Sequence, residues 1–279
     1  MRVLWWIAFT TRPLTTLELQ HALAVEVGER AIDEENLPEI EDMVSVCAGL
    51  VTVDEETDTI RLVHYTTQEY FERTRIEWFP DAQTDIATIC VTYLLFDVFD
   101  TGFCQTDGEF QSRLKLNPLY DYAARNWGHH AHTAPAELEL LINDLLESQA
   151  KVSSCSQAMM AEKTWRHWRY SDRPLPEKMT GAHLAAYFGL KNVMLALLKN
   201  EHDLDLKDYH SRTPLSLAAG RGHEAVVKLL LGQTGVDPDS NDKFGQTPLL
   251  RAAMGEHKAV VGLLLAIEGV NPDSQDIFS

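Results

Sequence analysis

Positive charge is scarce in this sequence. The chain holds 24 lysine and arginine residues against 42 aspartate and glutamate residues, which gives a formal net charge of −18. The shortage begins at the N-terminus, where residues 1–76 carry 6 basic and 15 acidic side chains. Binding to nucleic acid or to an anionic membrane begins with Lys and Arg meeting phosphate. We therefore expect neither nucleic acid nor a membrane as a partner.

Long apolar runs are also missing. No stretch approaches the roughly 20 apolar residues that a membrane-spanning helix needs. Seven apolar residues follow Arg2, as in a short signal peptide, but Arg12, Pro13 and Glu18 interrupt the pattern. We therefore expect a buried helix that begins at or before Met1.

Cysteines are rare, and they do not occur as closely spaced pairs in the sequence. The four cysteines are far apart and none forms a C-x-x-C pair: Cys47, Cys90, Cys104 and Cys155. Disulfide and metal frameworks use closer or paired spacing. Reduced, buried thiols in a cytoplasmic protein are the expected state, with no metal and no cofactor.

A repeat occupies the C-terminal third. "TPLSLAAGRGHEAVVKLLL" begins at Thr213 and "TPLLRAAMGEHKAVVGLLL" begins at Thr247, while a weaker copy, "TGAHLAAYFGLKNVMLALL", begins at Thr180. A period of 33 to 34 residues is typical of helical repeat proteins. The pattern resembles the ankyrin repeat over residues 174–279, with about three repeats and the start of a fourth hairpin. The resemblance implies a solenoid of helix pairs joined by hairpins.

The residues of the middle copy fit this geometry physically. The Thr213 hydroxyl is placed to cap a short helix, and Pro214 suits its first turn. Gly222 allows the turn between the paired helices. In the third copy Glu256 stands in the position of Gly222, which predicts a reshaped turn.

The first copy departs further from the pattern. Gly181 replaces proline and Leu190 replaces histidine, so we expect this terminal repeat to cap the stack against another domain. At the other end, "VNPDSQDIFS" matches the start of the hairpin "VDPDSNDKFG" and then stops. Either the last helices face solvent, or the chain is a fragment or truncated gene model of a longer array, and we favour the second interpretation.

Repeat stacks of this kind present an extended concave surface to a partner protein. We expect the hairpin tips and first helices to supply the contacts. The candidate protein-binding residues are Tyr209, His210, Arg212, Ser216, Arg221, Lys243, Phe244, Gln246, Arg251 and Met254.

Residues 1–78 predict a winged-helix domain. Thr15 with Glu18 forms one capping-box pattern at the start of a helix, and Asn36 with Glu39 forms another. Alternation around an acidic turn in "LVTVDEETDTIRLVHY" predicts a β-hairpin. Winged helices often bind DNA through the third helix, but here that helix carries Glu39, Glu41 and Asp42 with no Lys or Arg. Its charge disfavours DNA and favours docking to a protein.

The stretch "RLVHYTTQEYFE" (residues 61–72) has a catalytic appearance. Thr66 and Glu69 form a third capping-box pattern, flanked by a staple pair, Tyr65 and Tyr70. The polar cluster therefore predicts a join between a strand and a helix. A lone histidine such as His64 is more often packed or hydrogen-bonded than a general base.

Residues 79–170 predict a helical bridge between the wing and the repeats. Helices are expected in "DAQTDIATICVTYLLFDVF", in "PLYDYAARNWGHHAHTA", ending near Gly128, and in "PAELELLINDLLESQAKV". His129, His130 and His132 lack the i,i+4 spacing of helical zinc ligands, so we expect no metal there. Trp165 and Trp168 of "WRHWRY" are expected to pack the bundle against the first repeat.

Three stretches carry a wider resemblance: "RPLTTLELQHALAVE", "NLPEIEDMVSVCAGLVTVDEETDTIRLVHYTTQEYFE" and "NPLYDYAARNWGHHA". They resemble the region after the nucleotide-binding domain of fungal NACHT–ankyrin proteins, which are STAND-type, NLR-like signalling ATPases. The winged-helix part is similar to the type named "GPI inositol-deacylase winged helix". The resemblance implies a NACHT ATPase domain as a partner in cis or in trans.

The motifs of catalysis are not found in this sequence. It holds neither a G-x-x-x-x-G-K-[ST] phosphate loop nor a G-x-S-x-G nucleophile elbow. We predict a mainly α protein made of a winged helix, a helical bridge and an ankyrin solenoid, which acts as a non-enzymatic interaction and regulatory module. A stand-alone decoy adaptor is one alternative. Less favoured alternatives are a hydrolase using His64 or the histidines at 129–132, and a DNA-binding regulator.

Overall fold

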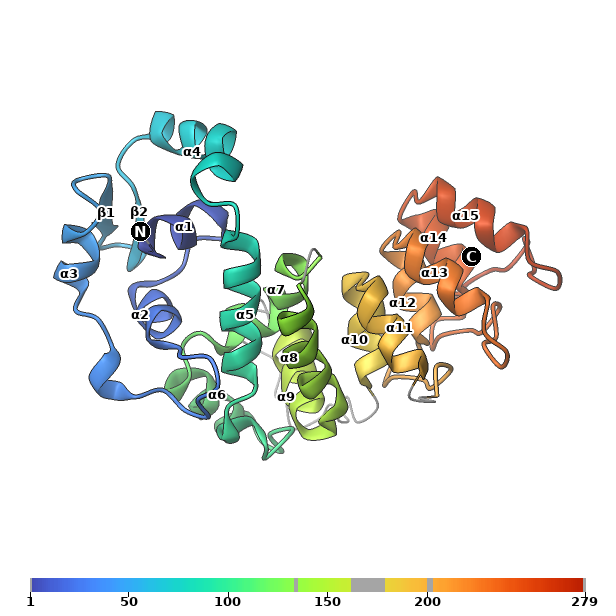
Figure 1. Ribbon diagram of the computed structural model, residues 1–279. Coiled ribbons are helices and arrows are strands. Elements are labelled where there is room, and N and C mark those ends of the chain that lie inside the picture. Colours follow the sequence, from blue (N-terminus) through green and yellow to red (C-terminus); the bar gives the residue numbers. More distant parts are fainter. Residues whose placement is uncertain (1, 133–134, 162–178, 200–202, 278–279) are drawn as a thin grey trace. The chain divides into compact units, whose positions relative to one another are not determined.

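The structure is a computed structural model, and it describes residues 2–132, 135–161, 179–199 and 203–277. The chain divides into two compact units, which are Met1–Asp100 with Asp107–Leu141 and Thr101–Thr106 with Ile142–Ser279. Helices dominate both units, and the described strands form a single two-stranded sheet (Figure 1). Each unit is described below by itself.

The first unit begins with a buried helix, as expected. Its elements are α1 (Arg2–Phe9), α2 (Thr16–Ala24), the 3₁₀ turn η1 (Glu34–Asn36), α3 (Ile40–Ser45), β1 (Val51–Asp54), β2 (Thr59–Leu62), α4 (Tyr65–Trp78), α5 (Ala82–Leu94), η2 (Asp97–Phe99), α6 (Asp107–Leu116) and α7 (Tyr120–His130). Val3, Trp5 and Trp6 of α1 are buried. Strands β1 and β2 pair antiparallel with Val51 opposite Leu62, which confirms the hairpin.

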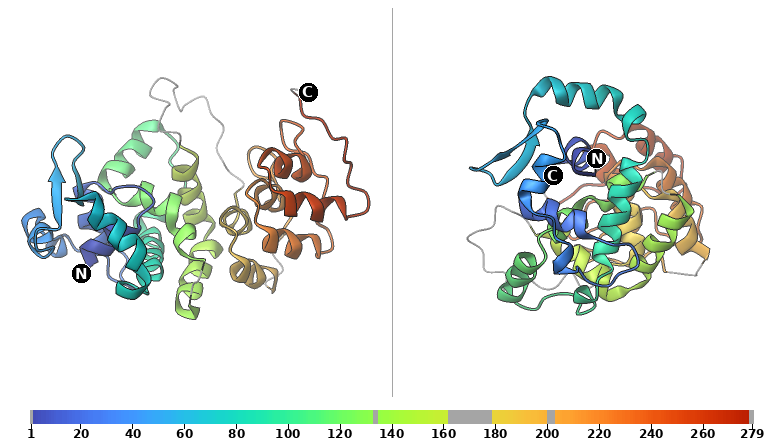
Figure 2. Two further views of the ribbon diagram at one scale, coloured as in Figure 1. Left: turned by 90° about the horizontal axis from the view of Figure 1, so that it is seen from above. Right: turned by 60° about the vertical axis from the view of Figure 1, so that its left-hand side comes forward.

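Aromatic side chains fill the core between α5 and α7. The rings of Phe99 and Tyr120 stack with their centroids 4.7 Å apart, and Tyr93 packs against Phe99 at 6.1 Å. Helix α4 contributes much less, because Phe71 is the one buried side chain among those described on it. Figure 2 shows α4 and the hairpin on the outside of this unit.

The three capping boxes have different outcomes. At α2 the Thr15 hydroxyl accepts from the Glu18 amide at 3.2 Å, and the Glu18 carboxylate accepts from the Thr15 amide at 2.8 Å, so this box is confirmed. The box at Asn36 is wrong, because η1 ends at Asn36 and α3 begins after Glu39 without a side-chain cap. The box at Thr66 is also wrong, because α4 already begins at Tyr65, with His64 O accepting the first helical hydrogen bonds.

The second unit carries the repeat. It contains the end of α8 (Ala136–Glu147), then α9 (Gln149–Met160), α10 (Gly181–Phe188), α11 (Lys191–Lys199), α12 (Pro214–Gly220), α13 (Glu224–Leu231), α14 (Pro248–Met254) and α15 (Lys258–Leu265). Helices α10, α12 and α14 stack in sequence order as an inner layer, and α11, α13 and α15 stack as an outer layer (Figure 1). The single helix expected after Pro135 is wrong, because Ser148 caps a new helix by accepting from the Lys151 amide at 3.4 Å.

Gly181 is explained by its neighbour. A Cβ at this position would lie 2.6 Å from the carbonyl oxygen of Leu146 and 2.9 Å from its Cβ. Proline, which occupies the position in the other repeats as Pro214 and Pro248, would collide with the end of α8. The first repeat therefore packs its inner helix against the preceding helices of this unit.

The turn at Glu256 keeps the geometry of the turn at Gly222. Both residues have positive φ, +57° and +74°, and the same pair of backbone hydrogen bonds closes both turns. The expectation of a reshaped turn is therefore wrong, and Glu256 occupies the left-handed region that favours glycine.

The four cysteines are buried thiols that do not take part in disulfides among the described residues. Burial raises the pKa of the Cys47 thiol, and does so more strongly for the fully buried Cys90. Along the described part of the chain, none of the helices is both long enough and apolar enough to cross a membrane. The tryptophans of "WRHWRY" lie outside the described residues.

Candidate protein-binding surface of the ankyrin repeats

Two buried aspartates shape the hairpin tips. Asp208 Oδ1 accepts from the amides of His210 and Arg212, both at 2.8 Å. In the next repeat Asp242 Oδ1 accepts from the amides of Phe244 and Gln246, at 2.8 and 2.9 Å. The two aspartate side chains are 1% and 0% exposed. Each tip is thus built around an interior carboxylate that is not available to a ligand.

Arginines neutralise these carboxylates. Arg212 Nη2 lies 2.7 Å from Asp208 Oδ2, and Arg251 Nη1 lies 3.1 Å from Asp242 Oδ2. The arginine side chains are 15% and 23% exposed. Burial and the nearby Arg212 charge lower the pKa of Arg251. Each arginine therefore ties its hairpin tip to the interior carboxylate beneath it.

The tips are joined to one another and carry aromatic rings. The Lys243 amide donates to His210 O at 2.9 Å, and the Ile277 amide donates to Phe244 O at 3.0 Å. The His210 and Phe244 rings stack with centroids 6.3 Å apart. Nζ of Lys243 lies 3.5 Å from the centroid of the Tyr209 ring, which is a cation–π contact. The tips of successive hairpins therefore carry aromatic and cationic side chains next to one another.

A second aromatic–cation pair lies at the C-terminal end of the inner helices. The Arg221 guanidinium sits 3.6 Å from the centroid of the Tyr187 ring. Met254, at the equivalent position to Tyr187 two repeats later, is 64% exposed. This end of the inner layer offers both apolar surface and positive charge.

One predicted contact residue is corrected. Ser216 is 1% exposed because its position in the first turn of α12 packs inside the stack, so its side chain does not face a ligand. Gln246 is half-buried, and its amide donates to Asp276 Oδ2 at 3.3 Å. The predicted residues that remain exposed or half-exposed, apart from the two arginines above, are Tyr209, His210, Arg221, Lys243, Phe244, Gln246 and Met254.

The sequence reasoning missed three residues of this surface. Lys207 is exposed and its Nζ donates to Asn241 O at 3.4 Å, across to the next tip. Ile277 is 65% exposed at the position that Tyr209 and Lys243 hold in the earlier hairpins. Tyr187 lies under Arg221. Aligning the hairpins with one another, position by position, would have found the first two.

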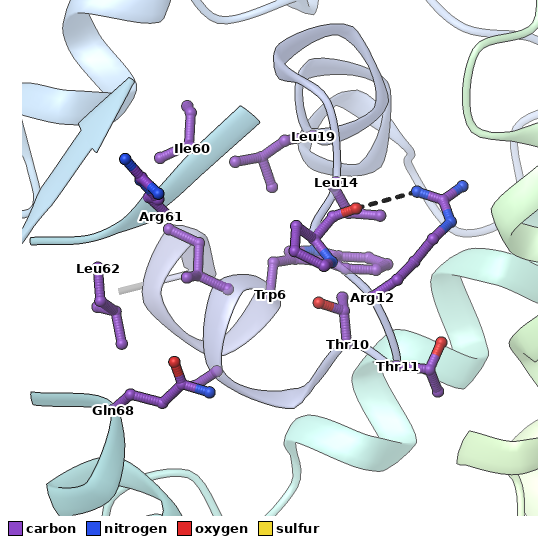
Figure 3. Close-up of a pocket in the computed structure, with 13 residues that line it drawn as sticks. Trp6, Thr10, Thr11, Arg12, Leu14, Leu19, Ile60, Arg61, Leu62 and Gln68 are labelled. Atoms are coloured by element: carbon purple, nitrogen blue, oxygen red, sulfur yellow. Dashed lines mark hydrogen bonds between the residues drawn. The ribbon is translucent and has the colours of Figure 1, made fainter. Parts of the chain in front are cut away.

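The winged-helix unit contains a cavity of about 280 Å³ (Figure 3). It is lined by Trp6, Ile7, Ala8, Thr10, Thr11, Arg12, Pro13, Leu14, Leu19, Ile60, Arg61, Leu62 and Gln68. The lining includes no His, Cys, Ser, Asp or Glu. Arg12 donates to Pro13 O at 3.0 Å and forms a bidentate pair with Glu18, so its charge is already matched. The lining residues therefore offer no general base for catalysis.

The histidines that attracted attention in the sequence are separate from that cavity. His64 is exposed and its Nδ1 lies 3.2 Å from Thr66 Oγ1. His130 is buried, with Nδ1 2.5 Å from Gln83 Oε1 and Nε2 2.9 Å from the Tyr122 hydroxyl. Because Gln83 Oε1 can only accept, the Nδ1–H group of His130 donates to it. The Nε2 atom of the neutral imidazole then accepts from the Tyr122 hydroxyl. Burial lowers the pKa of His130 to about 4.

These histidines do not form a ligand set. His129 and His132 are exposed, whereas His130 points into the core between Tyr122 and Gln83. Within the described residues there is no group of three His, Cys, Asp or Glu side chains arranged to hold a metal ion.

Comparison with known families agrees with this architecture. Residues 1–87 match the winged helix domain of GPI inositol-deacylase, and residues 176–276 match ankyrin repeats in three copies. The chain therefore combines a winged-helix domain with an ankyrin-repeat stack in a mainly helical protein. Ankyrin repeats support a general role in protein binding.

Two curated relatives are similar to parts of the chain. The azaphilone pigments biosynthesis cluster protein L of Monascus ruber is 27% identical over 263 residues, covering 83% of this chain. This chain spans 54% of the length of that relative. The 60 kDa lysophospholipase of Mus musculus is 49% identical over 47 residues, which is 17% of this chain and 8% of the mouse protein.

Proposed function

We propose that this chain is a non-enzymatic, cytoplasmic interaction module whose ankyrin stack binds a partner protein. The observation that carries the proposal is the row of rings and cations on the hairpin tips, held in place by the interior carboxylates of Asp208 and Asp242. Rigid aromatic and cationic side chains on a preorganised surface are typical of protein-binding sites. The partner would contact Tyr209, His210, Lys243 and Phe244 at the tips.

The winged-helix unit would relay or restrain a signalling ATPase. The combination of this winged helix with ankyrin repeats supports a role as the sensing part of an NLR-like protein, with a NACHT domain as partner in cis or in trans. The acidic surface of α3 favours a protein over DNA as the docking partner. This role predicts that the chain alone does not bind ATP tightly, and a tight ATP affinity measured by calorimetry would contradict it.

Site-specific photo-crosslinking tests the proposed binding surface. Phe244 and Met254 are each replaced by p-benzoylphenylalanine in the full chain, and Ala225, which is exposed on α13 of the outer layer, serves as the matched control. We expect one partner protein from extract of the source organism to cross-link at positions 244 and 254 and not at position 225. Equal cross-linking at all three positions would contradict the proposal.

We do not extend the named activity of the mouse relative to this chain, because the two match over 47 residues, which is 8% of the mouse protein. A lysophospholipase needs an activated nucleophile with a base within hydrogen-bonding reach. Among the described histidines, His64 contacts a threonine, and His130 is locked in the core as a neutral group. We therefore propose binding and not hydrolysis as the function.

A further inference from the structure

The hairpin tips differ in charge from the rest of the molecule. The chain carries 42 acidic side chains against 24 basic ones. In the tip segments 206–212 and 240–246 the acidic residues are Asp208 and Asp242, and both are interior. The exposed charged side chains there are Lys207 and Lys243. Within these two segments the exposed charge is therefore positive, while Asp203, Asp237 and Asp273 are exposed carboxylates elsewhere on the same hairpins.

Neither lysine forms an ion pair among the described residues, although Lys207 interacts electrostatically with the half-buried carboxylate of Asp205. Lys207 Nζ donates to a backbone carbonyl, Asn241 O, at 3.4 Å. Lys243 Nζ lies over the Tyr209 ring, and among the described residues it forms no ion pair. This cation–π contact places the Lys243 ammonium at the face of the Tyr209 ring. Both ammonium groups can therefore form an ion pair with an anionic ligand.

Apolar surface surrounds the two lysines. Phe244 is 39% exposed, Ile277 is 65% exposed and Leu206 is 44% exposed. Lysines and apolar side chains that lie along one line are complementary, in charge and in apolar surface, to a peptide segment in which carboxylates alternate with apolar residues. The hydrogen bonds between tips, from Lys243 N to His210 O and from Ile277 N to Phe244 O, fix the spacing of this row.

We propose that the tips select an extended acidic segment of the partner protein, with carboxylates on Lys207 and Lys243 and apolar side chains on Tyr209, Phe244 and Ile277. This inference rests on the proposed function and adds the chemistry of the ligand. A polynucleotide fits less well, because two lysines supply few phosphate contacts and the net charge of −18 repels a polyanion.

Fluorescence anisotropy on the full chain tests the proposal. The probes are fluorescein-labelled peptides of about twelve residues that alternate Glu with Leu, Gln with Leu, or Lys with Leu, together with a single-stranded DNA of similar length. We expect the Glu–Leu peptide to bind about tenfold more tightly than the other three probes and to weaken as salt is raised. Equal binding of the Gln–Leu or Lys–Leu peptide, tighter binding of the DNA, or no binding of the Glu–Leu peptide would overturn it.

Variants of the full chain locate the binding. K207E/K243E is expected to lose about tenfold in affinity for the Glu–Leu peptide, and the milder K207Q/K243Q to lose less. The control, K258E, reverses an exposed lysine at the start of α15 and is expected to bind as the wild type does. Equal losses in K258E would overturn the assignment to the tips. Cross-linking of a partner at position 244 without this peptide selectivity would overturn the inference and leave the proposed function standing.

Discussion

Nε2 of His223 lies 3.0 Å from the carbonyl oxygen of Tyr187 in the preceding repeat. Because a carbonyl can only accept, the ring nitrogen must donate. His257 repeats the relationship with Gly220 O at 3.3 Å. Leu190 occupies the equivalent position in the first repeat, which has no earlier repeat to contact, and it is 4% exposed. The histidine therefore joins repeats, and its replacement in the first copy has a physical reason.

Replacing His223 by Ala should destabilise the second unit. The substitution leaves the part-buried Tyr187 O without its inter-repeat donor, and the loss of such a hydrogen bond costs about 1 kcal/mol. Chemical denaturation of His223→Ala against the wild type measures the loss in free energy of unfolding. His132→Ala is the matched control, because His132 is exposed in the other unit. Equal stability of the two variants would contradict this account.

Gly222 should resist a methyl group for two reasons. Its φ is +74°, and a Cβ there would lie 2.5 Å from Nδ1 of His257. We expect Gly222→Ala to cost about 1–3 kcal/mol more than Gly235→Ala, because Gly235 has φ +94° but nothing within 4 Å of its would-be Cβ.

A double-variant cycle separates strain from collision at this turn. If the collision with His257 dominates, Gly222→Ala combined with His257→Ala will cost less than the sum of the two single changes. Strict additivity of the two free energies would show that the backbone conformation alone sets the cost.

Glu256→Gly should stabilise the protein. Glu256 has φ +57°, and a side chain in the left-handed region costs about 1–2 kcal/mol, partly offset by the greater freedom of glycine when unfolded. We expect a net gain of up to about 1 kcal/mol in the free energy of unfolding. Gln275→Gly, an exposed position without positive φ, should give no gain. If Glu256→Gly lowers the free energy of unfolding as much as Gln275→Gly does, the backbone at residue 256 is not strained.

The buried His130 predicts a pH dependence. Its pKa is lowered from 6.5 to about 4 in the folded protein, mainly by burial and then by the neighbouring His129. Between these values the unfolded chain binds more protons than the folded chain, so stability falls as the pH drops through 6.5 toward 4. The loss from this group is on the order of 3 kcal/mol.

Denaturation at a series of pH values checks this term. His130→Gln keeps a hydrogen-bonding side chain and removes the titration. We expect the stability advantage of the wild type over His130→Gln to shrink as the pH is lowered from 7 to 4.5. An advantage that stays constant over that range would mean that His130 does not titrate as the structure indicates.

The repeat architecture was readable from sequence because its signals are local. Thr213 and Thr247 accept from the amides of Ser216 and Leu250, as the capping pattern predicts. Thr15 and Glu18 form their box for the same reason. In these places each helix start depends on residues within one turn.

The capping-box predictions were wrong where an interaction other than the expected cap set the first residue of the helix. At Asn36 a short 3₁₀ turn used the residues of the expected box, and α3 began only at Ile40. At α4 the carbonyl oxygen of His64, two residues after the end of β2, accepts the first helical hydrogen bonds, so the helix begins before Thr66. The break at Ser148 did carry a local signal, since Ser is a favoured cap.

The binding surface was only partly predictable. Aromatic and cationic residues at the tips could be read from the hairpin pattern. The interior position of Ser216, and the pairing of Arg212 with Asp208 and of Arg251 with Asp242, depend on packing between repeats and needed the structure. The reason for Gly181 likewise lies in the close approach of Leu146, 35 residues earlier in the chain.

The central claim is that the hairpin tips bind the partner protein. The most direct measurement is calorimetry of the cross-linked partner, once purified, against the full chain and its Phe244→Ala variant. Leu116→Ala is the matched control, because Leu116 is 75% exposed on α6 of the other unit. We predict that Phe244→Ala weakens binding about tenfold and that Leu116→Ala leaves it unchanged. Equal affinities for all three proteins would contradict the account.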